Sequence, residues 1–192
     1  MSKKLLLHSC CGPCSAAVVP FLQDLFYEAT CFFYNPNIHP FKEYKQRLDT
    51  MQEFALQTNT PLIIHGKYGL NKFLNKIQNL KEDIFEENIE NKKKNKQLRC
   101  QQCYKMRLKE TTKYAAENNY QFFTTTLLYS VYQDHKEIVD LAKYYAKKYN
   151  IQFVYQDFRK FWQQGITMSK QLNLYRQKYC GCIFSEHERY SK

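Results

Sequence analysis

The chain has 192 residues, of which 44% are hydrophobic, and it carries 29 Lys and Arg against 18 Asp and Glu. This composition suits one folded domain with a sizeable core and excludes a disordered chain. No apolar run approaches the roughly 20 residues of a membrane span, and no signal-peptide cleavage site follows the first lysines. We therefore expect a cytoplasmic protein with no membrane partner. The net charge of +11 favours a polyanionic partner, nucleic acid first.

Strand-like and helix-like segments alternate along the chain. The predicted strands cover 4–9, 29–35, 61–66, 120–130 and 151–158, and the predicted helices cover 13–26, 40–58, 71–80, 100–119, 134–150 and 168–177. This alternation predicts an α/β fold with a parallel sheet of about five strands and flanking helices. We expect a single domain over residues 1–192, with a polar surface insertion at 81–99.

Polar residues follow the predicted strands, where ligands bind in parallel α/β sheets. They are Cys10 and Cys11 after the first strand, Asn35 and Asn37 after the second, Ser130 and Tyr132 after the fourth, and Asp157 at the end of the fifth. We expect these groups to converge with the thiols at one edge of the sheet. The stretch "YNPNIHP" either reads a modified base through Asn35, Asn37 and His39, or is a rigid turn whose asparagines bond their own backbone.

Eight cysteines stand out because clustered thiols in a reducing compartment more often bind metal or perform redox chemistry than form structural disulfides. Seven of them form three clusters: Cys10, Cys11 and Cys14; Cys100 and Cys103; and Cys180 and Cys182. Cys31 stands alone in a predicted strand, where we expect a core residue.

Cys10, Cys11, Cys100 and Cys103 make a four-thiolate set that suits either Zn²⁺ or an iron–sulfur cluster. A turn lets adjacent sulfurs face one point, and the helix N-terminus that follows favours thiolate. Cys14 either replaces one of these ligands or packs beneath the site, and we leave it out of the set. Cys180 and Cys182, separated by Gly181, are either a strained and therefore labile disulfide pair, two more ligands, or free thiols.

The motifs together resemble the QueH-type epoxyqueuosine reductases. The resemblance rests on "LLLHSCCGPC", "FFYNPNIHP", "RCQQCYKMRL", "FTTTLLYS", "DFR" and "YRQKYCGCIFS", which occur in that order from residue 5 to 185. It implies a Rossmann-like fold similar to the adenine-nucleotide α-hydrolase group. It also implies reduction of epoxyqueuosine at the wobble position of tRNA, the last step of queuosine formation, with the epoxide oxygen leaving as water.

The resemblance also implies roles for six cysteines. Cys10, Cys11, Cys100 and Cys103 would hold a [4Fe–4S] cluster, and Cys180 and Cys182 would be a redox-active disulfide pair. The family is thought to hold a further metal ion, iron, beside the cluster, for which Asp157 is the first candidate ligand and Asp134 the second. Relatives in the wider group hold ATP phosphates on a glycine-rich loop after the first strand. Because that loop is "SCCGPC" here, we expect no use of ATP.

Opening an epoxide to an alkene and water consumes two electrons and two protons, which the dithiol of Cys180 and Cys182 could supply. His8 and Asp157 are the candidate proton donors, and the electron donor is unknown. Sixteen tyrosines offer surfaces for stacking anticodon bases. The alternatives are a zinc-thiolate RNA-binding module, a thiol–disulfide oxidoreductase acting through Cys180 and Cys182, and an ATP-dependent tRNA-modifying enzyme, which the missing glycine-rich loop disfavours.

Overall fold

The computed structural model describes residues 3–78 and 89–191. Five parallel strands form one sheet, as the sequence predicts, in the order β3-β2-β1-β4-β5: β1 (Lys3–His8), β2 (Tyr27–Phe33), β3 (Leu62–Ile64), β4 (Phe122–Thr125) and β5 (Gln152–Phe153). The central strand β1 places Leu5, Leu6 and Leu7 out of contact with water, because both faces of the sheet are covered. His8, the last residue of β1, lies opposite Phe32 of β2 and Thr125 of β4.

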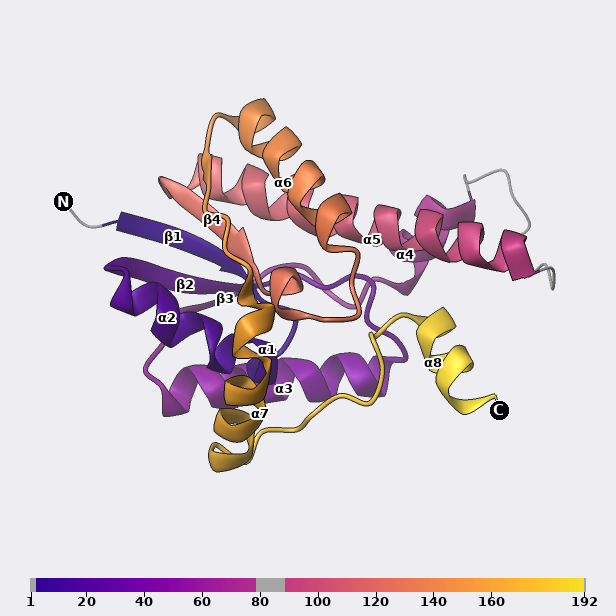
Figure 1. Ribbon diagram of the computed structural model, residues 1–192, viewed down its shortest axis with the longest axis horizontal. Helices are drawn as coiled ribbons and strands as arrows, with labels where there is room; N and C mark the ends of the chain where they lie inside the picture. The colour runs from indigo at the N-terminus through magenta and orange to yellow at the C-terminus, as the bar shows by residue number, and fades with distance from the viewer. Residues whose placement is uncertain (1–2, 79–88, 192) are drawn as a thin grey trace.

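Helices cover both faces of the sheet (Figure 1). One layer consists of α1 (Gly12–Ala16), α2 (Val18–Asp24), α3 (Phe41–Gln57) and α7 (Trp162–Gln171), and the other of α4 (Leu70–Gln78), α5 (Ile89–Glu117) and α6 (His135–Tyr149). Two 3₁₀ helices, η1 (Thr126–Tyr129) and η2 (Phe158–Phe161), follow β4 and β5, and α8 (Ile183–Tyr190) closes the chain. The result is a three-layer, Rossmann-like α/β domain. Within the described ranges, no helix is long and apolar enough to cross a membrane.

The direction of the chain across the sheet reverses at β1. From β1 the chain builds β2 and β3 on one side, and it then returns to build β4 and β5 on the other. A reversal of this kind leaves a crevice at the carboxyl ends of the two strands on either side of it. Here those strands are β1, which leads into the cysteine turn, and β4, which leads into η1.

Helices α5, α7 and α8 differ from the sequence-based prediction. Of the predicted insertion at 81–99, residues 81–88 lie outside the described ranges, whereas 89–99 form the first turns of α5, which was expected to start near Cys100. These turns lack an apolar stripe because their contact is polar: Lys96 and Arg99 form ion pairs with Glu188 of α8, at 2.9 and 3.2 Å. Helix α8 itself was not predicted, and α7 covers Trp162–Gln171 instead of 168–177.

Candidate active site

Three thiols meet in the turn between β1 and α1. The Sγ atoms of Cys10 and Cys11 lie 3.8 Å apart, and the Cys11 thiol donates to the Cys14 Sγ at 3.0 Å. All three sulfurs lie within 4.8 Å of one another. The turn is fixed by η1, because the Cys10 N–H donates to the Thr126 hydroxyl at 3.1 Å. This group could bind a metal ion or a cluster, and it includes Cys14, which the sequence analysis left out of the ligand set.

The other two cysteine clusters face the same cavity. Its volume is about 640 Å³, within the range of roughly 300–1,000 Å³ that is usual for ligand sites. The thiols along its wall are those of Cys10, Cys14, Cys100, Cys103, Cys180 and Cys182. Cys100 and Cys103 come from α5, where a spacing of three residues places them on one face of the helix. Cys180 and Cys182 come from the segment between α7 and α8.

The spacing of the sulfurs limits what they could hold. Among the described residues, Cys100 and Cys103 lie outside the group of sulfurs within 4.8 Å of one another. Two thiolates bound to one zinc ion at about 2.3 Å each cannot be more than about 4.6 Å apart. In this arrangement, therefore, Cys10, Cys11, Cys100 and Cys103 do not surround one ion. Cys10, Cys100 and Cys103 line the larger cavity, whereas Cys11 does not.

A buried guanidinium accompanies the thiols of α5. Arg107 is 3% exposed and lies one helical turn after Cys103. Its Nη2 donates to the Cys103 Sγ at 2.9 Å and its Nε to the Cys103 carbonyl at 3.2 Å. No ion pair joins Arg107 to a carboxylate in the described part of the chain. Since a buried charge needs a counter-charge, the site is built for anionic sulfur at Cys103.

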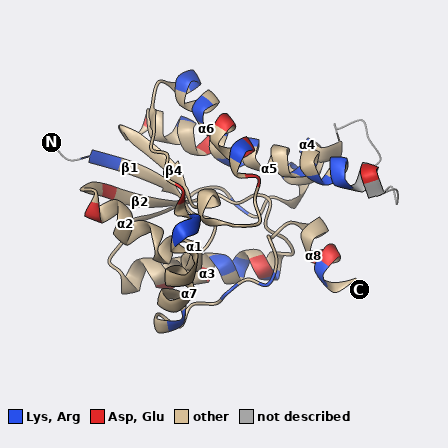
Figure 2. Ribbon diagram, viewed as in Figure 1, with Lys and Arg blue, Asp and Glu red and all other residues tan. Residues whose placement is uncertain are grey.

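Positive charge surrounds the cavity. Besides Arg107, the basic residues in its lining are Arg47, Lys96, Arg99, Arg176, Lys178 and Arg189, against the single acidic residue Glu188. Figure 2 shows Lys and Arg on α5, on α8 and along the segment that links α7 to α8. The cavity therefore suits an anionic ligand.

The thiols differ in how readily they ionise. The neighbouring Cys11 and Cys14 thiols hold the pKa of Cys10 well below its ordinary value, although burial opposes this. Burial raises the pKa of Cys103, against the charge of Arg107. Burial and the neighbouring Cys180 and Cys182 raise the pKa of Cys100 to about 11. Such thiols bind a metal only with release of their protons, so metal binding and proton release are coupled here.

The candidate proton donors and carboxylate ligands have other partners. His8 is fully buried, with Nδ1 2.9 Å from the Thr125 hydroxyl and Nε2 3.3 Å from the Tyr34 carbonyl, and burial lowers its pKa to about 3. Asp134 caps α6 by accepting from the Glu137 N–H at 3.0 Å. Asp157 caps η2, and its two oxygens accept from the Arg159 guanidinium at 2.8 and 2.6 Å. Neither aspartate lines the cavity.

The stretch "YNPNIHP" lies beneath the site and does not line the cavity. Asn35 donates to the Ser9 carbonyl at 2.9 Å, which supports the backbone just before the cysteine turn. His39 lies 3.1 Å from the Pro36 carbonyl and contacts the rings of Tyr68 and Phe73. The asparagines do not bond their own backbone as the rigid-turn interpretation expects, because Asn35 bonds Ser9 and the Asn37 amide has no hydrogen-bond partner among the described residues. Cys31 is buried in β2 among core residues, as predicted.

Several site residues carried no sequence signal that we recognised. Gln133 donates to the Cys180 Sγ at 3.1 Å, and Arg47 reaches the carbonyls of Tyr179 and Cys180. Only Arg107 could have been found from the sequence, because it follows Cys103 by four residues on a helix. Arg47 belongs to a helix far from any cysteine in the sequence, and only the fold brings it to the site.

The fold and the site together define a class of protein. It is an α/β protein that gathers thiols in a basic cavity at the reversal point of a parallel sheet, a place suited to metal or redox chemistry on an anionic ligand. Residues 5–188 match the model of the family described as epoxyqueuosine reductase QueH, and the chain belongs to this family.

Individual relatives agree with this assignment over nearly the whole chain. The epoxyqueuosine reductase QueH of Dehalococcoides mccartyi is 35% identical over 192 residues, which cover 100% of this chain and 97% of the relative. That of Thermotoga maritima is 32% identical and matches 98% of this chain and 93% of its own. That of Histophilus somni is 34% identical and matches 95% of this chain and 72% of its own. The resemblance stated from the motifs is thus confirmed.

Proposed function

We propose that this protein reduces epoxyqueuosine to queuosine at the wobble position of tRNA and releases the epoxide oxygen as water, the last step of queuosine biosynthesis. The observation that carries the proposal is the convergence of three separate cysteine clusters on one basic cavity, in a chain of the QueH family. We place the protein in the cytoplasm, where tRNA is modified, as a single domain. The turn after β1 carries thiols in place of a glycine-rich phosphate loop, so ATP has no part in the proposal.

Cys10, Cys11, Cys100 and Cys103 are the proposed ligands of a [4Fe–4S] cluster. Two observations support the fit: Cys10, Cys100 and Cys103 line one cavity, and the buried Arg107 offsets thiolate charge at Cys103. When bound, such a cluster supplies electrons and an iron that polarises the epoxide oxygen. The additional metal ion beside it stays a prediction, since both aspartates considered for it are engaged as helix caps.

Cys180 and Cys182 are the proposed redox pair. Their conversion from dithiol to disulfide breaks two S–H bonds, forms one S–S bond and yields two electrons and two protons. Removing the epoxide oxygen as water consumes the same number of each, so one oxidation of the pair balances one turnover. An external donor, which is not identified, must then reduce the disulfide before the next turnover.

The rim of the cavity is the proposed binding surface for the anticodon loop. Arg176, Lys178 and Arg189 would attract its phosphates. On the other side Tyr132 is 82% exposed and meets Trp162 edge to face, with the ring centroids 5.9 Å apart. An exposed aromatic ring at the mouth of a site offers a stacking surface for an unpaired base.

One observation favours a second candidate, a zinc-thiolate RNA-binding module. The sulfurs of Cys10, Cys11 and Cys14 are close enough to share a single ion without Cys100 or Cys103. This candidate predicts a colourless protein that contains zinc, binds tRNA and leaves epoxyqueuosine unchanged. A pure thiol–disulfide oxidoreductase would instead be active without metal and without tRNA.

The experiment that separates these candidates is an anaerobic purification. Iron, sulfide and zinc are quantified, and the protein is then given a reductant and tRNA that carries epoxyqueuosine. We expect about four irons per chain, a brown colour, and a nucleoside that has lost one oxygen by mass spectrometry. Zinc in place of iron, with an unchanged nucleoside after cluster reconstitution, would refute the reductase.

Three cysteine variants test the separate roles. Cys100→Ala should lose both the iron and the activity, because it removes a cluster ligand. Cys182→Ser should keep the iron and the colour but fail under multiple turnover, because a single thiol cannot form the disulfide that supplies the two electrons. Cys31→Ala is the matched control: its thiol is buried in β2 away from the cavity, so iron and activity should persist. Bleaching in Cys182→Ser would show that the ligand assignment is wrong.

A further inference from the structure

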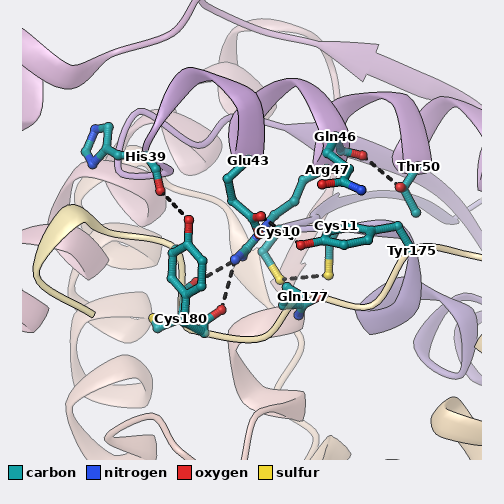
Figure 3. Close-up of polar contacts among 12 residues, drawn as sticks. Cys10, Cys11, His39, Glu43, Gln46, Arg47, Thr50, Tyr175, Gln177 and Cys180 are labelled. Carbon is teal, nitrogen blue, oxygen red and sulfur yellow. Dashed lines mark hydrogen bonds and ion pairs between the residues drawn. The ribbon is translucent and has the colours of Figure 1, made fainter. Parts of the chain in front are cut away.

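Residues 172–182 run between α7 and α8 and carry Cys180 and Cys182 to the cavity. One side chain of α3 holds this segment by its main chain. The Arg47 guanidinium donates from Nη2 to the Tyr179 carbonyl and from Nη1 to the Cys180 carbonyl, both at 2.9 Å (Figure 3). Arg47 is only 2% exposed, so water does not compete for these bonds.

Arg47 is itself held in place. Its Nε donates to Oε1 of the buried Glu43 at 2.6 Å. The other carboxylate oxygen of Glu43 accepts from the Tyr175 hydroxyl at 2.8 Å, so the same carboxylate also binds the C-terminal segment (Figure 3). A planar guanidinium with fixed donors loses little freedom on binding, which suits it to hold two neighbouring carbonyls in one geometry.

Further bonds hold the same loop to the residues before α3. The His39 N–H donates to the Gly181 carbonyl, and the Tyr179 hydroxyl donates to the His39 carbonyl, each at 2.7 Å. The carbonyls of Tyr179, Cys180 and Gly181 are therefore all held in succession. Gly181 has a φ of 131°, and a Cβ there would lie 3.1 Å from Nη1 of Arg47. Glycine thus lets the loop take a strained backbone directly against the guanidinium.

We propose that Arg47 is a positioning residue that holds the loop of Cys180 and Cys182 in its dithiol geometry and so makes the disulfide of this pair easy to reduce. In the structure both cysteines are free thiols, and their sulfurs contact different partners, Gln133 and Ser185. In this proposal, closing the short Cys-Gly-Cys ring moves the backbone at the carbonyls that Arg47 holds. Bonds that stabilise only the dithiol form shift the equilibrium away from the disulfide.

This inference rests on the proposed redox role of Cys180 and Cys182, and it adds a reason why the pair stays ready for turnover. Arg47 also lines the cavity, and its charge acts on the Cys11 and Cys10 thiols. It therefore links the cysteine turn with the redox loop through one buried side chain, without touching the sulfur of either redox cysteine.

The test measures the thiol–disulfide equilibrium of the pair directly. Anaerobically purified protein, with whatever metal it carries, is equilibrated with mixtures of reduced and oxidised dithiothreitol. In this exchange the S–S bond of oxidised dithiothreitol takes up the two electrons and two protons that leave the cysteine pair. The thiols are then trapped by alkylation, and the peptide that contains Cys180 and Cys182 is quantified by mass spectrometry.

For Arg47→Met we expect the equilibrium to shift toward disulfide by roughly tenfold, the scale of one or two lost charge-assisted hydrogen bonds. Arg47→Lys should shift it less, because a single ammonium can replace only part of the fork. The matched control is Lys45→Met on the same helix, where Lys45 forms an exposed ion pair with Asp49 and does not contact the C-terminal segment. The thiol–disulfide equilibrium of Lys45→Met should equal that of the wild type.

A second variant covers the case in which Arg47→Met does not fold. Tyr179→Phe removes only the bond to the His39 carbonyl, and it should shift the equilibrium in the same direction by a smaller factor. An equilibrium in both Arg47 variants equal to that of Lys45→Met, or a shift away from disulfide, would overturn the proposal. The readout needs neither tRNA nor turnover, so this failure is distinct from a failure to reduce epoxyqueuosine.

Discussion

At the scale of single residues, the wall of the cavity depends on the absence of one methyl group. A Cβ at Gly165 in α7 would lie 2.2 Å from the Tyr129 hydroxyl oxygen and 2.9 Å from Cζ of the same ring. Tyr129 is buried and lines the cavity, and its hydroxyl donates to the Trp162 carbonyl at 3.0 Å. Glycine at 165 is thus what allows α7 to approach η1.

Gly165→Ala should destabilise the protein by about 1–3 kcal/mol, because overpacking outweighs the gain of about 1 kcal/mol that helix propensity alone would give. The measurement is the midpoint of urea unfolding. Gln164→Ala, at the exposed neighbouring position, is the control and should be neutral or stabilising.

A double variant identifies the atom responsible. Tyr129→Phe removes the closest atom, so it should recover part of the stability lost in Gly165→Ala. Equal midpoints for Gly165→Ala and Gln164→Ala would show that α7 does not pack on Tyr129 as described.

The cysteines show how far sequence reasoning reaches at this scale. Strand ends were enough to predict that Cys10 and Cys11 lie at the carboxyl edge of the sheet, whereas Cys100 and Cys103 were added to the set from their spacing. The position of Cys14 was ambiguous, because a residue at the start of a helix can face either the core or the crevice. Arg47 belongs to no motif. A basic protein carries many arginines on its helices, and only tertiary packing determines which of them is buried at the site.

At the scale of elements, the carboxylate at the start of α6, that of Asp134, could serve either of two roles. Asp134 was considered both as the cap of this helix and as a ligand of a further metal ion. The structure shows the cap, with a bond from the Glu137 N–H to the Asp134 carboxylate, and it places Asp134 outside the cavity lining. The two roles differ in which substitutions they tolerate.

Asp134→Ala should cost about 0.5–2 kcal/mol of stability, whereas Asp134→Ser, which retains a capping oxygen, should cost much less. Iron content should be unchanged in both variants. Unfolding midpoints and metal analysis of the same preparations provide the check. A loss of iron in Asp134→Ser with stability preserved would show that the carboxylate binds metal.

The strands were easier to predict from the sequence than some of the helices. All five strands were predicted because buried parallel strands form continuous runs of large apolar residues, as in "LLL" of β1 and "CFF" of β2. The beginning of α5 and the whole of α8 were missed. They contact each other through the ion pairs of Lys96 and Arg99 with Glu188, and α8 buries Phe184 against Phe73 of α4. With so few apolar contacts, the helical periodicity of apolar residues is weak there.

At the scale of the whole molecule, the net charge of +11 is concentrated in part around one cavity. Basic side chains from α3, α5, α8 and the segment before α8 border one cavity, beside the exposed ring of Tyr132. Charge and stacking contribute differently to RNA binding: the first weakens with salt, and the second depends on it far less.

Lys178→Met should weaken binding of an anticodon stem-loop and reduce the slope of log K against log salt by about 0.7, the loss of one phosphate contact. Tyr132→Ala should weaken binding by about 1–3 kcal/mol and leave the slope unchanged. Titrations at several salt concentrations measure both quantities.

Lys148→Met, in the last turn of α6 and outside the cavity lining, is the control for charge alone. If it lowered the slope as much as Lys178→Met does, the attraction would be spread over the surface and not directed to the cavity.

The position of the redox segment in the chain has a consequence for biosynthesis. A growing polypeptide folds from its N-terminus, and all five strands are complete once Phe153 has left the ribosome. At that stage the thiols of the cysteine turn and of α5 have emerged from the ribosome, while Cys180 and Cys182 have not. The segment 172–182, which Arg47 holds at the cavity, and α8 after it are therefore the last parts of the cavity wall to be added. Until then the cavity is open on that side, and a group bound by the thiols of the cysteine turn and of α5 can be delivered before the entrance narrows.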